Sequence, residues 1–126
     1  MLIRAGARWA FWLACVAILV AALTPARDHP VSLTPWDKAD HIIAFYVLSL
    51  LALAAFPRIK PHVLAAGLSA LGAAIEVVQA TPLIGRDGDV LDWVADTLAI
   101  AAATAPLALG WWRGLARGSD AIPPAP

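Results

Sequence analysis

Residues 37–56 read DKADHIIAFYVLSLLALAAF, and this stretch decides the fold class. Its charged residues lie in the first turn, and none follows His41 before the stretch ends at Phe56. A transmembrane helix needs about 20 largely apolar residues, which is the length available here. The stretch therefore predicts a helix that crosses a membrane, with a polar end at one surface.

Three further stretches meet the same requirement, at about residues 9–24, 62–80 and 90–112. Prolines and glycines separate them, and neither residue type continues a helix well. The prediction is an all-α fold, a four-helix transmembrane bundle that forms one domain over residues 1–117. The proline-rich residues 118–126 are expected to form a disordered C-terminal tail.

The first stretch also has features of a cleaved signal peptide, because Arg4 and Arg8 precede a short apolar run. No small-x-small cleavage motif follows this run, since Leu23, Thr24 and Pro25 occupy its place. A retained first span is the preferred interpretation, and the signal peptide stays open as the alternative.

The composition favours lipid rather than water as the main solvent of the chain. Hydrophobic residues make up 61% of the 126 residues and charged residues 14%, whereas soluble domains carry about 25% charged residues. Membrane lipid is therefore the expected partner. The formal net charge of zero provides no basis for nucleic-acid binding, and the single Cys15 excludes an intrachain disulfide.

Basic residues predict that both termini are cytoplasmic, because Lys and Arg accumulate in short cytoplasmic loops. Most of the nine then fall on the inner side: Arg4, Arg8, Arg58, Lys60, Arg113 and Arg117. The outer side keeps Arg27, Lys38 and Arg86. Of the nine acidic residues, only Asp120 falls on the inner side. This separation of the acidic residues is independent of the orientation rule, which counts Lys and Arg alone.

Polar residues gather where the second span begins, the third ends and the fourth begins, and the predicted topology places all three points on the outer side. Carboxylates within a span are costly in lipid and normally face the bundle interior. The sequence therefore predicts one outer pocket lined by side chains from three helices and a loop: His41, Glu76, Gln79, Arg86, Asp92 and Asp96.

Within this pocket, the candidates for catalysis are His41, Glu76 and Asp92, because imidazole and carboxyl groups can transfer protons. The candidates for ligand binding are Asp37, Lys38, Gln79, Arg86 and Asp96. No residue is assigned as a metal ligand and the cofactor is unknown, although a divalent ion among Glu76, Asp92 and Asp96 stays open.

Structural interpretations of the same carboxylates also stay open. Asp40 and Asp89 are placed to cap helix N-termini. Glu76 lies near a helix C-terminus, where capping does not explain a carboxylate, but an ion pair with Arg86 or His41 would.

The polar residues resemble those of a known family in both order and spacing. The elements are Asp37-Lys38-x-x-His41, Glu76-x-x-Gln79, Gly85-Arg86 and Asp92-x-x-Ala95-Asp96. Together they are similar to the VanZ-like family of small bacterial membrane proteins, over roughly Trp36 to Ala103. Asp96 stands where that family usually has Asn, and Ala99 where it usually has Gly. The resemblance implies a multi-pass protein of the bacterial cytoplasmic membrane, with the polar residues facing outward.

The expected function is to bind or process an envelope-related ligand at the extracytoplasmic face, such as a lipid-linked or other anionic headgroup. The family is named for a protein linked to teicoplanin-type glycopeptide resistance, which is therefore an expected association. Whether the protein is an enzyme stays open. No nucleophile motif, phosphate loop or HExxH occurs, so the sequence does not indicate a particular reaction. The alternatives are a non-catalytic scaffold with a structural polar network, and a transporter or proton path. Polar residues confined to the outer half argue against the path, and the oligomeric state is not indicated.

Overall fold

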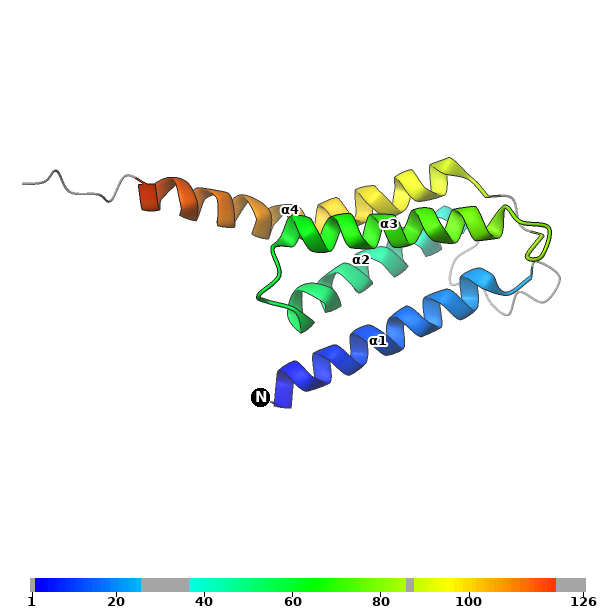
Figure 1. Ribbon diagram of the computed structural model, residues 1–126, viewed down its shortest axis with the longest axis horizontal. Helices are drawn as coiled ribbons and strands as arrows, with labels where there is room; N and C mark the ends of the chain where they lie inside the picture. Colours follow the sequence, from blue (N-terminus) through cyan, green and yellow to red (C-terminus); the bar gives the residue numbers. More distant parts are fainter. Residues whose placement is uncertain (1, 26–36, 86–87, 120–126) are drawn as a thin grey trace, which may run out of the picture.

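The computed structural model describes residues 2–25, 37–85 and 88–119. Over these residues it contains four helices and no strand: α1 (Leu2–Leu23), α2 (Asp37–Ala55), α3 (Pro61–Gln79) and α4 (Val90–Ser119) (Figure 1). All four are long and apolar enough to cross a membrane. The predicted all-α, four-helix architecture is confirmed.

Helix boundaries follow from local chemistry. α2 ends at Ala55, two residues before Pro57, and α3 begins with Pro61 at its first position, where a missing N–H costs nothing. Asp89 caps α4, because its Oδ1 accepts a hydrogen bond from the backbone N–H of Leu91 at 2.8 Å. The capping role expected for Asp89 is therefore observed.

Two helices are longer than the sequence predicts. α1 begins at Leu2 rather than near residue 9, because the arginines and alanines before the apolar run are strong helix formers. α4 continues through Pro106 to Ser119, past the predicted end at residue 112. Its 30 residues extend beyond the ends of the other helices (Figure 1). Gly118 and Ser119 of the predicted tail are thus helical, and residues 120–126 lie outside the described residues.

The core lies where α2 packs between α1 and α4, with α3 against α4. It contains Phe11 of α1, Phe45 and Leu48 of α2, Ile75 of α3 and Ile100 of α4. Large apolar side chains also cover the outside of all four helices. Such a surface is unfavourable in water and suits contact with lipid tails.

The up-and-down arrangement gives the bundle two distinct ends (Figure 1). One end holds the last turn of α1, the starts of α2 and α4 and the end of α3, and is called the polar end below. The other holds the start of α1 and the α2–α3 segment, residues 55–61, and is called the connection end. The N-terminus and the later half of α4 lie toward the connection end (Figure 1).

Candidate functional site

The polar end brings together side chains from α2, α3, α4 and the residue before α4. We call these residues the polar cluster: Lys38, His41, Glu76, Asp89, Asp92 and Asp96. Five of them were predicted as site residues, and the sixth was expected only as a cap. Glu76 and Asp92 are buried, and Asp96 is 0% exposed.

Lys38 joins the starts of α2 and α4. Its Nζ lies 2.7 Å from Oδ2 of Asp89 and 2.5 Å from Oδ1 of Asp92. The Lys38 ammonium lowers the pKa of Asp89 below its usual value, and the backbone N–H of Leu91 lowers it further. Lys38 was predicted to contact an anionic ligand, but its charge here is already matched by two carboxylates.

His41 and Asp96 form a second link between α2 and α4. His41 Nδ1 lies 3.2 Å from Oδ1 of Asp96. Asp96 fits against α3 because residue 72 is glycine: a Cβ there would lie 3.1 Å from Oδ2 of Asp96. A neutral imidazole that donates its Nδ1–H to this carboxylate has its lone pair on Nε2. Asp96 therefore holds the ring and selects its tautomer.

Glu76 is the least satisfied member of the polar cluster. Its side chain is 8% exposed, and Oε2 accepts a hydrogen bond from the backbone N–H of Asp89 at 2.9 Å. Oε1 is buried without a hydrogen-bond partner among the described residues. Buried polar atoms are nearly always hydrogen-bonded, so an orphaned carboxylate oxygen calls for an explanation. The proposed ion pair with Arg86 falls on a residue outside those described.

The three predicted catalytic residues come together. One nitrogen of His41 and one carboxylate oxygen each from Glu76 and Asp92 lie within 4.8 Å of one another. They come from three different helices, so the bundle itself sets their positions. Four carboxylates in the polar cluster face a single ammonium. The arrangement is electronegative and can hold a cation or transfer protons.

Gly88 was not predicted as a site residue, yet it determines how closely the segment before α4 packs against the end of α3. A Cβ at this position would lie 2.7 Å from the carbonyl oxygen of Glu76 and 2.8 Å from the Cβ of Ala80. Only glycine allows the segment before α4 to lie directly on the end of α3. Its place in a short loop between two carboxylates, Asp87 and Asp89, is the sequence signal that marks it.

Of the other predicted ligand-binding residues, one lies apart from this geometry and two have side chains that the structure does not describe. Gln79 is 3% exposed, and its Nε2 donates a hydrogen bond to the carbonyl of Ala22 at 2.9 Å, which ties α3 to α1. Asp37 begins α2, but its side chain is not among those described. Arg86 lies outside the described residues. Their roles toward a ligand stay predictions.

Hydrogen bonds between α3 and α4 support the cluster from α4 residues that directly follow Asp92 and Asp96. Trp93 Nε1 donates to the carbonyl oxygen of Ser69 at 3.1 Å, and the hydroxyls of Ser69 and Thr97 lie 2.9 Å apart. Side-chain links of this kind are a common means of helix association in membranes. They hold the α4 face that carries Asp92 and Asp96 against α3.

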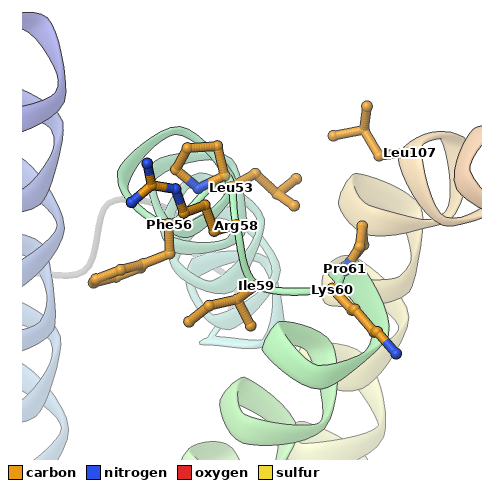
Figure 2. Close-up of a pocket in the computed structure, with 8 residues that line it drawn as sticks. Leu53, Phe56, Arg58, Ile59, Lys60, Pro61 and Leu107 are labelled. Carbon is orange, nitrogen blue, oxygen red and sulfur yellow. The ribbon is translucent and has the colours of Figure 1, made fainter.

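The connection end has a different character. A hollow of about 320 Å³ lies between the α2–α3 segment and α4, and Figure 2 shows Leu107 of α4 across it from this segment. Arg58 and Lys60 are among its lining residues, which include no carboxylate. Nearby, Arg8 Nε donates to the carbonyl of Ala55 at 3.3 Å, and Phe11 packs edge-on against Phe56.

No family model, curated protein or solved structure matches the chain. The polar cluster must therefore be interpreted from its own chemistry. That chemistry is a partly buried group of carboxylates, one imidazole and one ammonium, able to transfer protons or bind a cation, at one end of a bundle of membrane-spanning length.

Proposed function

We propose that the chain is a VanZ-like protein of a bacterial cytoplasmic membrane, whose polar end faces outward and binds or processes an envelope-related ligand. The observation that carries the proposal is Glu76, a buried carboxylate beside His41 and Asp92 with one oxygen that has no partner among the described residues. A purely structural network has no need of such an atom, because an unpaired polar group in a membrane bundle lowers stability.

The chemistry of the cluster supports a role in proton transfer or ligand positioning. His41 is oriented by Asp96, and Glu76 lies beside it with capacity to accept a hydrogen bond. Lys38 is already paired with Asp89 and Asp92. We therefore assign to Arg86 the role of attracting an anionic headgroup. An outward-facing site of this kind would meet lipid-linked cell-wall precursors, which is how a link to glycopeptide resistance would arise.

Orientation is the part of the proposal that cells can report most simply. In a Cys15→Ala background, Leu83→Cys at the polar end and Lys60→Cys at the connection end both place a thiol on an exposed position. Gly88 is avoided, because a side chain there would press on Glu76 and Ala80. A membrane-impermeant maleimide on intact cells should label Leu83→Cys and spare Lys60→Cys. The reverse pattern would contradict an outward polar end.

The function itself is tested by complementation of a deletion strain exposed to glycopeptide and other envelope antibiotics. Asp92→Asn and His41→Gln should fail to restore wild-type sensitivity while their membrane abundance stays normal. His62→Gln is the matched control, since this histidine is exposed near the start of α3, far along that helix from Glu76. Full restoration by all three variants would contradict the proposal.

The second candidate is a non-catalytic scaffold, and the two links between α2 and α4 favour it. Lys38 and His41 both bind carboxylates of the neighbouring helix segment, as a structural network would require. Replacing a buried polar pair by apolar residues of similar size is often neutral or stabilising. A His41→Leu/Asp96→Leu variant that melts like the wild type and restores the phenotype would establish the scaffold. A folded variant that loses the phenotype would support the site.

A further inference from the structure

We propose that the polar end binds one divalent transition-metal ion, of the Zn²⁺ type, through His41, Glu76 and Asp92. One donor atom from each residue lies within 4.8 Å of the other two. Zinc binds histidine nitrogen and carboxylate oxygen at about 2.0–2.2 Å in tetrahedral geometry, so donors that share an ion lie about 3.3–3.6 Å apart. The three donors would have to approach one another by up to about 1.3 Å, through side-chain rotation, to hold an ion together.

The unpartnered oxygen of Glu76 is the second and independent sign of a ligand. Glu76 is 8% exposed and its Oε1 has no hydrogen-bond partner in the described part of the chain. The other oxygen accepts a hydrogen bond from the backbone N–H of Asp89, and one oxygen of this carboxylate lies within 4.8 Å of donor atoms of His41 and Asp92. A metal ion would complete the coordination of this carboxylate.

Asp96 supplies the support that metal-bound histidines normally have. A histidine ligand usually donates its second ring N–H to a carboxylate or carbonyl, which fixes the tautomer and the ring orientation. His41 Nδ1 lies 3.2 Å from the buried Asp96, so the ion would be bound through Nε2. The proposed site thus has a positioning residue as well as three ligands.

Charge and donor type select the class of ion. Among the described residues, Glu76, Asp92 and Asp96 are buried carboxylates, and the half-buried Lys38 supplies the ammonium beside them, so a divalent cation would reduce the negative charge that the bundle buries. An imidazole among the donors favours a transition metal over Mg²⁺ or Ca²⁺, which prefer oxygen ligands throughout. Three protein ligands also leave a coordination position for water or a ligand oxygen, as in catalytic zinc sites.

The test uses the full chain, purified in detergent without a polyhistidine tag and stripped of metal by a chelator. Titration with Zn²⁺ should show one ion per chain, and Mg²⁺ in excess should not displace it. Glu76→Gln and Asp92→Asn should abolish this binding, and Asp96→Asn should weaken it about 10- to 100-fold. His62→Gln, which changes a histidine outside the polar cluster, should bind like the wild type.

Two results would overturn the metal site. One is a wild-type chain that binds no Zn²⁺ in stoichiometric amount. The other is unchanged binding in folded Glu76→Gln and Asp92→Asn variants, which would place the ion elsewhere. If those variants do not fold, Co²⁺ added to the wild type decides: strong visible absorption of a low-coordinate ion is expected, and the weak bands of six-coordinate Co²⁺ would refute the site. Metal binding is measured on purified protein and envelope function in cells, so either proposal can fail alone.

Discussion

The two ends of the bundle differ in the sign and the burial of their charged side chains. At the connection end, Arg8 donates to the backbone carbonyl of Ala55 and its guanidinium lies 5.9 Å from the ring centre of Phe56, while the arginine itself stays exposed. At the polar end, carboxylates of α3 and α4 are buried beside the ammonium of Lys38 and the imidazole of His41. Basic residues at a membrane surface need no function beyond orientation. A buried carboxylate oxygen without a partner in the described residues, as in Glu76, calls for an explanation.

Among single substitutions, the largest loss of stability is expected at Gly88, at the polar end. Gly88→Ala forces a methyl group against the Glu76 carbonyl and Ala80, and such overpacking costs about 1–3 kcal/mol. The melting temperature in detergent and Zn²⁺ binding should fall together. Gly67→Ala is the control, because a Cβ there meets nothing within 4 Å and helical Ala is about 0.5–1 kcal/mol better than Gly. Equal melting temperatures for both variants would show that the polar end is not closely packed at Gly88.

A substitution at the connection end should lower stability less than Gly88→Ala does. Arg8→Lys keeps the positive charge and removes the planar group that contacts Ala55 and Phe56. Cation–π contacts at exposed positions contribute about 0.5–1 kcal/mol, so the loss of stability should stay near or below that value. Envelope phenotype and Zn²⁺ binding should both be unchanged. A loss of either would mean that the two ends are coupled.

The smallest expected effect is on how the melting temperature depends on pH. The pKa of Asp89 is lowered by Lys38 and by the N–H of Leu91, so its pairing stabilises the fold above the unfolded pKa of about 3.9 and is lost as pH falls through the lower folded value. The wild type should therefore lose melting temperature below about pH 4. Asp89→Asn should lose less over the same range, although its melting temperature at neutral pH should be slightly lower. Parallel pH profiles for the two proteins would exclude this role for Asp89.

Helix number and the convergence of His41, Glu76 and Asp92 were predictable from the sequence. Apolar length determines the spans, and an up-and-down path brings alternate helix ends to the same level. Lys38 was a candidate partner for the carboxylates, but its choice of Asp89 and Asp92 was not predictable, because it depends on how the segment before α4 lies on α3. That close approach is permitted by Gly88, whose steric role appears only once α3 and the loop are placed.

Gln79 and α4 illustrate two further limits. The three-residue spacing of Glu76 and Gln79 places both on one helix face, but the position of α1 decides that Gln79 donates to Ala22. Helix α4 passes Pro106 and ends at Ser119, although Gly110, Gly114 and Gly118 disfavour helix, so local propensity does not predict its length. Spacing in one helix predicts a shared face, and only the packed bundle shows which neighbour that face meets.

The most direct test of the polar end as a functional site is the melting temperature of Glu76→Gln measured beside its envelope phenotype. Glutamine preserves the shape and the acceptor for the Asp89 N–H but removes a buried charge whose Oε1 has no partner in the described residues. Stability alone gains from this change. We expect a melting temperature equal to or above that of the wild type in metal-free detergent, together with loss of the phenotype. A variant that melts at a markedly lower temperature, or that melts normally and keeps the full phenotype, would contradict the proposal that Glu76 serves function rather than the fold.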